Sequence, residues 1–308
     1  MSEKRPKICV VGSSNMDLIS KIPRLPKMGE TLVGHSFHMG CGGKGANQAV
    51  MAAKLGAQVT MVTKLGRDPL GEMTFKNYRD LGIDTAYIFF DEKRFSGVAP
   101  ILVDDQGRNM IVIVPGANDG LSPEDARTAQ KAILSADILI CQLEVPIETT
   151  LEAFRIAKEG GVRTILNPAP AHPLPDELYK LSDIFAPNET ETELLIGMPV
   201  KTLEEAEEAA KKLRQAGPET VIITLGEKGA LLVDEEGTTH VPAVETDAVD
   251  TTGAGDAFIG SLAYFLAEGR PMRDAIRRAN AVAAISVTKV GTQVSFPTRE
   301  EVAHLIGE

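Results

Sequence analysis

The sequence predicts an α/β fold, in which a doubly wound, mostly parallel, Rossmann-like sheet has helices on both faces and carries a small β-sheet lid. Three observations predict it. Short β-branched and aliphatic runs alternate with helical stretches along most of the 308 residues. Those runs are apolar at nearly every position, which is typical of parallel strands buried on both faces. Two segments that break the alternation look like strands with no helix after them, so we assign them to the lid.

Six apolar runs predict the strands of the main sheet. They are KICVVG (7–12), QVTMVTKLG (58–66), ADILICQLE (136–144), VRTILNPA (162–169), SDIFAPN (182–188) and TVIITLG (220–226). Helical spacing of apolar residues predicts helices at 45–56, 149–161 and 202–217. A second strand follows the Thr-Leu-Gly turn within 221–233. The α/β domain therefore comprises residues 1–14, 41–91 and 115–308.

The lid is predicted from residues 15–40 and 92–114. The segment 29–40 alternates in polarity and puts Val33, Phe37 and Met39 on one face. The segment 97–116 holds two apolar runs joined by Asp-Asp-Gln-Gly, a hairpin pattern. Lids exclude water from ligands that bind at the carboxyl edge of an open α/β sheet. The alternative is an edge extension of the sheet without a function.

Composition and charge narrow the classes of function. Hydrophobic residues make up 43% and charged residues 24%, the balance of an ordinary globular protein. The net charge of −11 is spread along the chain, which argues against nucleic-acid and anionic-membrane partners. The N-terminal apolar run ends at Gly12, too soon for a signal peptide, and no run approaches the length of a membrane span. We expect a cytoplasmic protein.

The cysteines and histidines form no pattern typical of a metal site. Cys9, Cys41 and Cys141 include no CxxC pair, and the histidines form no HxxxH or HExxH. Cys9 and Cys141 lie in apolar strands, so we expect buried, reduced thiols. The sequence therefore predicts no zinc.

One glycine-rich segment, GCGGKGAN (40–47), formally matches the dinucleotide fingerprint G-x-G-x-x-G. Asp68 follows after a helix and a strand, as an acidic ribose ligand would. Against this interpretation, the preceding strand belongs to the lid and Lys44 interrupts the glycines. What remains is a tight turn into a helix N-terminus, whose N–H groups can bind hydroxyl or phosphate oxygens. A close helix–strand contact would explain the glycines equally well.

A second segment, AVDTTGAGDAFIG (248–260), indicates an anion site more strongly. Gly253, Ala254 and Gly255 precede a helical pattern, so an anion could approach the unpaired N–H groups of a helix N-terminus. Asp256 lies in the first turn, where the helix field should keep it ionised at neutral pH. An ionised carboxylate suffices as the base for phosphoryl transfer, in which positioning and charge stabilisation dominate. The alternative is an ordinary acidic first turn after a glycine loop.

Two polar clusters follow predicted strands. In APNETETELLIG (186–197), Asn188 and Glu191 have the spacing of a capping box, which fully explains them without a function. In GSSNMD (12–17), Asn15 and Asp17 face the carboxyl edge of the sheet, where an Asn–Asp pair suits vicinal hydroxyls. Each is also an unremarkable turn.

In combination, these segments resemble the ribokinase-like carbohydrate kinase family. The resemblance covers nearly the whole chain and rests on VVGSSNMDL, RLPKMGET, GCGGKGANQA, CQLEVP, NPAPA, APNETE, ITLGEKG, VDTTGAGDAF and KVGTQVSFP, in this order. GGKGANQA and NPAPA favour the ribokinase branch over the fructokinase and adenosine kinase branches. The loop before Asp256 reads Gly-Ala-Gly here, where some members have Ala-Ala-Gly.

The resemblance implies a role for each matching residue. Asp256 would take the proton of the sugar 5-hydroxyl, and the N–H groups of Gly253, Ala254 and Gly255 would hold the transferring phosphoryl group. The residues that would bind ribose are Asn15, Asp17, Gly43, Lys44, Asn47 and Glu144, together with Asp256. Those that would surround ATP are Asn188, Thr224, Gly226, Gly229, Gly255 and Asn280. Asn280 stands where some members have His, so its nucleotide contact is the weakest of these expectations.

The resemblance also implies cations and a partner. Glu191 would organise magnesium through water, which gives Mg-ATP as the cosubstrate. A monovalent cation, normally potassium, would lie beside the anion loop, partly on backbone carbonyls. The matching positions are Asp250, Thr252, Ser286, Lys289, Gly291 and Ser295. A homodimer through the lid sheets is implied, and the apolar runs at 97–103 and 109–114 agree with it.

The leading hypothesis is ATP-dependent phosphorylation of D-ribose at the 5-hydroxyl. Within the family, a kinase for deoxyribose, another pentose or a nucleoside stays open. A non-catalytic sugar-binding protein on the same fold is a different class, against which the complete Asp256 loop counts. A NAD-dependent oxidoreductase rests only on the glycine fingerprint.

Overall fold

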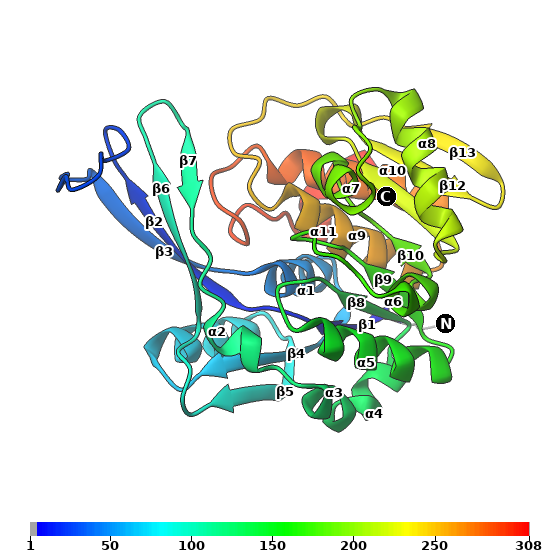
Figure 1. Ribbon diagram of the computed structural model, residues 1–308, viewed down its shortest axis with the longest axis horizontal. Helices are drawn as coiled ribbons and strands as arrows, with labels where there is room; N and C mark the ends of the chain where they lie inside the picture. Colours follow the sequence, from blue (N-terminus) through cyan, green and yellow to red (C-terminus); the bar gives the residue numbers. More distant parts are fainter. Residues whose placement is uncertain (1–4, 308) are drawn as a thin grey trace.

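The computed structural model describes residues 5–307 and forms two sheets. The body contains a nine-stranded sheet in the order β13-β12-β11-β10-β9-β8-β1-β4-β5. A four-stranded sheet in the order β3-β2-β6-β7 projects from it at one side (Figure 1). The predicted fold class is thus confirmed. Residues 1–4 and 308, which the sequence assigns to the α/β domain, lie outside the described residues.

The strands of both sheets follow the chain in this order: β1 (Lys7–Val11), β2 (Asn15–Lys21), β3 (Ser36–Gly42), β4 (Gln58–Gly66), β5 (Asp84–Asp91), β6 (Gly97–Val103), β7 (Asn109–Ile111), β8 (Ile138–Cys141), β9 (Arg163–Leu166), β10 (Ile184–Phe185), β11 (Thr220–Thr224), β12 (Ala230–Asp234) and β13 (Gly237–Val241). The helices are α1 (Lys44–Lys54), α2 (Pro69–Asp80), α3 (Pro123–Thr128), α4 (Gln130–Ser135), α5 (Ile147–Glu159), α6 (Asp176–Leu181), α7 (Glu189–Ile196), α8 (Leu203–Gln215), α9 (Ala254–Ala267), α10 (Met272–Ser286) and α11 (Arg299–Ile306), with short 3-10 turns η1 (Gly116–Gly120) and η2 (Gly226–Lys228).

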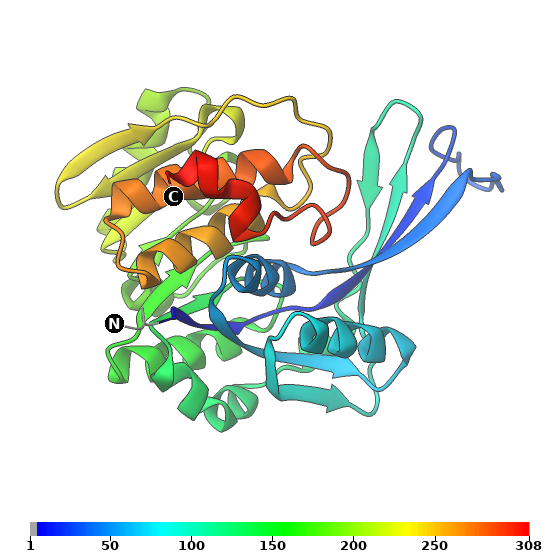
Figure 2. The ribbon, with the colours of Figure 1, turned by 180° about the vertical axis from the view of Figure 1, so that it is seen from behind.

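The main sheet is buried on both faces, as its apolar strands predict. In β1, Ile8 and Val10 join the core beneath α1, α9, α10 and α11, whereas Cys9 and Val11 join the core beneath α3, α4, α5 and α8. The two groups of helices lie on opposite sides of the sheet (Figures 1 and 2). Cys9 and Cys141 are buried free thiols, as expected, and burial raises the pKa of Cys9 to about 12.

All six predicted strands of the main sheet are present, although β10 contains only two residues. The pairs from β5 through β1 to β11 are parallel, while β11, β12 and β13 pair antiparallel. β5 and β13 were not predicted from the sequence. Both lie at the edges of the sheet, where half-exposed strands lose the continuous apolar pattern.

The chain reverses its direction of growth across the sheet between β1 and β8. From β1 it builds outward to β4 and β5, then returns and builds the other way through β8, β9 and β10. Open α/β sheets bind ligands outside the carboxyl ends of the strands at such a switch point. The polar residues that follow these strands are therefore brought together at one edge.

The lid draws its strands from both predicted segments, and we keep the predicted domain division as a proposal. The strand β3 runs from Ser36 to Gly42, so Val33 lies in the preceding loop and not on the strand face shared by Phe37 and Met39. That prediction was wrong because the alternating pattern extends further along the chain than the pairing with β2, which ends at Ser36.

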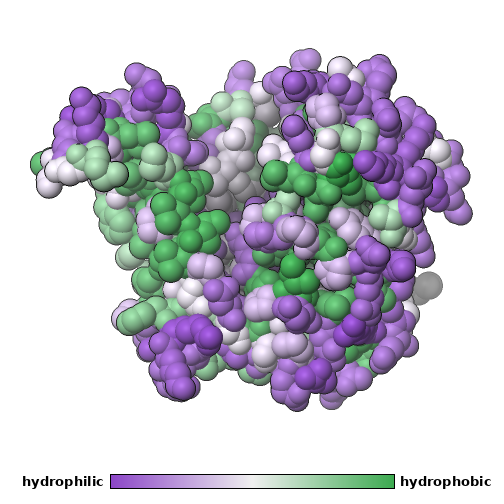
Figure 3. All heavy atoms as spheres, in the orientation of Figure 1, coloured by the Kyte–Doolittle hydropathy of each residue, from purple (hydrophilic) through white to green (hydrophobic). Residues whose placement is uncertain are grey.

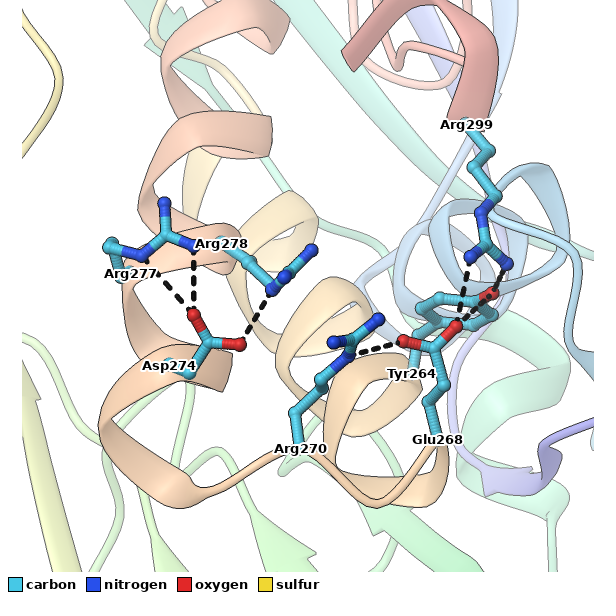
Figure 4. A network of polar contacts seen from close by, with 7 residues as sticks. All are labelled: Tyr264, Glu268, Arg270, Asp274, Arg277, Arg278 and Arg299. Carbon is cyan, nitrogen blue, oxygen red and sulfur yellow. Dashed lines mark hydrogen bonds and ion pairs between the residues drawn. The ribbon is translucent and has the colours of Figure 1, made fainter. Parts of the chain in front are cut away.

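The C-terminal helix α11 is fastened to the far end of α9. Arg299 binds Glu268 and the Tyr264 hydroxyl, and Arg270 pairs with the same Glu268 (Figure 4). These contacts hold the cover of one sheet face in place. Among residues 5–307, no helix combines the length and the apolar character that a membrane crossing requires.

Candidate active site

The glycine segment and Asp256 form the N-terminus of α9. Gly253 precedes the helix in the left-handed conformation (φ 80°), and no side chain caps its first N–H groups. These donors face a small cavity of about 160 Å³. The residues that line it include Lys44, Asn167, Asn188, Glu191, Thr224, Thr251, Gly253, Ala254, Gly255 and Asp256. The geometry therefore suits an anion.

A larger groove of about 970 Å³ lies at the other end of α9, between Lys54, Tyr264 and Arg299. None of the predicted site residues lines it. Size alone would favour this groove, but the clustered charges and helix N-terminus are at the smaller cavity. We therefore place the chemistry at the smaller cavity.

Asp256 is nearly inaccessible, and amides hold both of its oxygens. Asn47 Nδ2 donates to Oδ2 and Gln48 Nε2 donates to Oδ1, each at 2.9 Å. Burial raises the pKa of Asp256, while Lys44 and these two amides lower it. Burial therefore acts against the ionised form, which the helix N-terminus is expected to favour. A raised pKa makes Asp256 a stronger base.

Residues after β1 and β8 meet at the switch point. Ser13 Oγ donates to Glu144 Oε2 at 2.6 Å, and the Lys44 backbone N–H donates to the same oxygen at 3.0 Å. Burial works against the charge of Lys44, but Asp256, Glu144 and Glu191 outweigh it and raise the Lys44 pKa. Lys44 therefore keeps its positive charge at neutral pH and lies near several carboxylates at the cavity.

Asn15 and Asp17 begin the lid strand β2, so they are not part of a turn. Asp17 lies against Gly42 of the neighbouring strand, where any Cβ would come within 2.4 Å of its Oδ2. Burial, with smaller contributions from Glu144 and Asp256, raises the Asp17 pKa to about 6. The lid thus carries a carboxyl into the site. Asn15 Oδ1 accepts from Asn118 Nδ2 at 2.8 Å, which fixes that amide.

The glycine turn at 40–47 serves packing first. Gly43 precedes α1 with φ 91°, and a Cβ on Gly45 would lie 2.7 Å from the Ser13 backbone nitrogen. The close helix–strand contact is therefore real. Asp68 caps α2 by accepting from Gly71 N–H and also binds Ser96, so it is committed to structure. Asp68 is therefore not available to bind a ribose, which argues against a dinucleotide site at 40–47.

The capping box at the start of α7 is present and also borders the cavity. Asn188 Oδ1 accepts from the Glu191 N–H at 2.7 Å, and Glu191 Oε2 accepts from the Asn188 N–H at 2.9 Å. Burial raises the Glu191 pKa, opposed by the hydrogen bond from Asn188. Thr224 bridges to Asn188 and lines the same cavity. The capping box therefore does not exclude a functional role, because the same residues line the cavity.

The remaining predicted nucleotide residues lie outside this cavity. A Cβ on Gly229 would come within 2.2 Å of the Val241 carbonyl, so packing alone requires a glycine there. Gly226 adopts φ 53° in the same turn. Asn280 Nδ2 donates to the carbonyls of Val241 and Pro242, both at 3.1 Å. Gly229 and Asn280 thus contact the end of β13, and Gly226 provides the left-handed conformation of the turn before β12.

The predicted monovalent-cation residues join two loops beside the anion loop. The Asp250 carboxylate accepts from the Thr252 N–H and from the Gly291 N–H, at 3.0 and 2.9 Å. Ser286 and Ser295 donate their hydroxyls to carbonyls within their own turns, and Lys289 pairs with Glu301. The side chains of Asp250, Ser286, Lys289 and Ser295 thus already have partners within the protein.

Several polar residues of the site were not selected from the sequence. They are Ser13, Gln48, Asn118, Gln142, Asn167, Thr292 and Gln293. All of them except Asn118 lie inside quoted segments, but an amide or a hydroxyl in a helix or a loop has no local pattern that indicates a partner far along the chain.

Residues 5–299 match the pfkB family carbohydrate kinases. The chain belongs to this family. Among curated pfkB relatives, it is 45% identical to a deoxyribokinase of Salmonella typhi over 295 residues, covering 96% of each chain. It is 42% identical to a ribokinase of Mus musculus over 304 residues, covering 97% of this chain and 94% of the relative.

Solved structures of ribokinases have the same fold as this chain. The ribokinase of Arabidopsis thaliana, complexed with ribose and ATP, has a TM-score of 0.92 at 33% identity and covers 99% of this chain and 100% of its own. The ribokinase of Thermotoga maritima has a TM-score of 0.89 at 39% identity, covering 98% of this chain and 100% of its own. The protein is therefore a pfkB-family sugar kinase that is similar to both ribokinases and deoxyribokinases, and the expected family is confirmed.

Proposed function

We propose that this protein transfers the γ-phosphoryl group of ATP to the 5-hydroxyl of D-ribose, giving D-ribose 5-phosphate and ADP. One observation carries the proposal: a buried carboxylate, Asp256, lies in the first turn of α9, beside the uncapped N-terminus of that helix and near a cationic lysine, Lys44. A base, an anion hole and a cation in one cavity are what phosphoryl transfer requires. The mouse and Arabidopsis relatives named above are ribokinases.

In this proposal, Asp256 accepts the proton of the 5-hydroxyl as the new oxygen–phosphorus bond forms. The N–H groups of Gly253, Ala254 and Gly255 stabilise the transferring phosphoryl oxygens, and Lys44 adds a positive charge. The proposed ribose ligands besides Lys44 are Asn15, Asp17, Gly43, Asn47 and Glu144. The proposed ATP ligands are Asn188, Thr224, Gly226, Gly229, Gly255 and Asn280.

Magnesium fits the cavity through Glu191, whose carboxylate borders it beside the phosphate-binding loop. Within residues 5–307, no three acidic, histidine or cysteine side chains are grouped closely enough to hold a metal ion. Glu191 would hold the magnesium ion through water, and phosphate oxygens would be further ligands, since Mg²⁺ usually keeps several waters. When bound, it would neutralise charge on the phosphates. A potassium ion on the Asp250 and Gly291 loops would hold the anion loop in place.

Deoxyribose is the second candidate substrate, because the Salmonella relative is a deoxyribokinase and is 45% identical. The two sugars differ by one hydroxyl. A site that hydrogen-bonds this hydroxyl leaves buried polar groups unpaired when it is missing, and rejects the analogue strongly. The ratio of kcat/KM for the two sugars therefore decides between them.

The experiment is a measurement of ADP release from Mg-ATP with D-ribose and with 2-deoxy-D-ribose, in potassium and in a bulky organic cation. We expect ribose-dependent turnover, preference for ribose and loss of rate without potassium. Asp256→Asn should abolish turnover while the protein still binds sugar. Preference for deoxyribose would keep the mechanism and replace the substrate.

No turnover with any sugar, from folded protein that still binds ribose, would favour the non-catalytic interpretation. Ribose-dependent turnover retained by Asp256→Asn would contradict the role of Asp256 as the base. Rates independent of potassium would remove the monovalent cation from the proposal.

We also propose that two copies pair through their lids. Cross-strand partners point to the same side of a sheet, so the pairing of Ser20 with Phe37 and of Leu102 with Met110 puts these side chains on one face. Asp17 lies on the other face, toward the site. A second copy would cover the apolar face without blocking the sugar.

A further inference from the structure

A chain of buried amides ends on one oxygen of Asp256. Gln142 Nε2 donates to Gln48 Oε1 at 2.6 Å, and Gln48 Nε2 donates to Asp256 Oδ1 at 2.9 Å. Gln48 and Gln142 have no solvent exposure. They come from α1 and from the end of β8, so the contact exists only in the folded protein.

A second chain ends on the other oxygen. Asn77 Nδ2 donates to Gln293 Oε1 at 2.9 Å, Gln293 Nε2 donates to Asn47 Oδ1 at 3.0 Å, and Asn47 Nδ2 donates to Asp256 Oδ2 at 2.9 Å. Lys54 holds the Gln293 segment by donating to its carbonyl at 2.8 Å. Both chains therefore point their donors toward the same carboxylate.

The direction of the first chain follows from the chemistry of its ends. An ionised carboxylate only accepts hydrogen bonds, whereas an amide has one donor and one acceptor end. Gln48 must turn its NH₂ toward Asp256, which leaves its oxygen for Gln142, and Gln142 must then donate. Asn167 fixes the same direction independently. Its Nδ2 donates to the Ala186 carbonyl, so its Oδ1 accepts from Gln48 at 3.1 Å.

Keeping this direction has a cost at Gln142. Its Oε1 is buried without a hydrogen-bond partner among the described residues, and an unpaired buried carbonyl is unfavourable. Gly12 leaves the space for it, since a Cβ there would lie 2.1 Å from this oxygen. The fold thus tolerates an unpaired acceptor to supply a donor to Gln48.

Close helix packing sets the distance that Gln48 must span. A Cβ on Gly260 of α9 would lie 2.5 Å from the Gln48 backbone oxygen of α1. The two helices therefore touch through their backbones at this level. The Gln48 side chain reaches Asp256 because of this contact.

We propose that the two amide chains hold Asp256 in position and stabilise its ionised form against burial, with Gln48 and Gln293 as positioning residues and Gln142 fixing the polarity of the first chain. The inference rests on the proposed function, in which Asp256 is the base. Protonation of Asp256 would turn one carboxyl oxygen into a donor facing another donor, which both chains disfavour.

Charged groups near Asp256 also shift its pKa. Lys44 lowers its pKa and Glu144 raises it, while Asp256 in turn raises the pKa values of Asp17 and Glu191. The amides carry no charge. Replacing them leaves these four charges in place, so any shift in the titration of Asp256 reports the amides themselves.

The experiment compares Gln48→Met and Gln142→Met with the unsubstituted enzyme in the pH dependence of kcat/KM. Thr149→Val is the matched control, because it deletes one buried hydrogen bond, to the Leu121 carbonyl, away from Asp256. We expect Gln48→Met to lower kcat more than it changes the sugar KM. The apparent pKa on the acidic side of the kcat/KM profile (its acidic limb) should rise by about one pH unit. Gln142→Met should shift it in the same direction by less, and Thr149→Val should not move it.

A second readout does not depend on turnover. Loss of a donor destabilises only the ionised form, so Gln48→Met should lower the free energy of unfolding more near pH 8 than near pH 5. In an Asp256→Asn background this pH-dependent difference should disappear.

An unmoved acidic limb in folded Gln48→Met and Gln142→Met, or an unfolding difference that survives Asp256→Asn, would overturn the inference. Failure of the proposed function has a separate signature, namely absent sugar-dependent turnover or turnover retained by Asp256→Asn. The unfolding measurement still tests the amide chains in that case.

Discussion

At the scale of single residues, Asp17 shows how the site is prepared for a polar ligand. The lid strand β2 brings this carboxyl into contact with Gly42, and Thr292 Oγ1 lies at 3.4 Å from it. Burial, together with Glu144 and Asp256, raises its pKa to about 6. The ionised form is therefore destabilised in the free protein, and sugar hydroxyls would restore the hydrogen bonds that it lost from water.

We expect Asp17→Asn to stabilise the fold while weakening sugar binding. The folded-state pKa, about 6, lies above the ordinary value of 3.8, so the folded state holds this proton more tightly. Stability is therefore lost as pH rises from about 4 through 6. Near pH 8 the substitution should raise the free energy of unfolding by about 2–3 kcal/mol. Urea unfolding near pH 8 and near pH 4 checks this, and an equal gain at both pH values would contradict it.

At the scale of elements, α7 combines a structural and a proposed catalytic requirement in one residue. The Glu191 carboxylate caps the helix by accepting from the Asn188 N–H, and it borders the cavity beside Asp256. Capping needs only an acceptor, which a glutamine also provides. Organising magnesium needs the negative charge. The two requirements can therefore be separated by one substitution.

Glu191→Gln should leave thermal stability nearly unchanged and lower kcat about 10- to 100-fold, the usual effect of losing an outer ligand of a metal site. Glu191→Ala should lose the cap as well, at about 1 kcal/mol. Thermal unfolding and steady-state rates at several magnesium concentrations measure both effects. An unchanged kcat in Glu191→Gln would contradict the magnesium role and leave Glu191 with its capping role only.

At the scale of the whole molecule, the lid exposes an apolar face. Phe37 is 56% exposed, Met39 49%, Met110 50% and Val112 56%. Hydrophobic side chains gather over the lid at the left of Figure 3, where β6 and β7 lie in the matching view of Figure 1. Contiguous exposed apolar surface on a folded protein usually marks an interface. This supports pairing of two lids.

The double variant Phe37→Lys/Met110→Lys should convert a dimer into a monomer, because it places positive charges of both copies in an apolar contact. Sedimentation equilibrium at micromolar concentration measures this. Met73→Lys is the matched control, since Met73 is 44% exposed on α2, outside the lid. A monomeric unsubstituted protein, or an unchanged dimer in the variant, would contradict lid pairing.

Local sequence patterns were sufficient to predict much of the fold. Continuous apolar runs such as 7–12 and 220–226 predicted parallel strands, because a strand buried on both faces needs apolar residues at every position. Gly253 and Asn188 predicted two helix starts, because capping depends on residues within one turn. Asp256 could be selected as a candidate base from its position in the first turn of a helix, which is also a local feature.

Only the tertiary structure decided how these pieces act on one another. It linked Gln48, Gln142 and Gln293 to Asp256 through chains of hydrogen bonds, and burial raises the pKa of that carboxyl. Val33 lost its expected place on a strand because the pairing of β2 with β3 ends before it. The sequence by itself determined the buried strands, the α7 cap and the glycine turns, since these depend on neighbours within a few positions. Partners, burial and proton affinity depend on residues far apart in the chain, which only packing brings together.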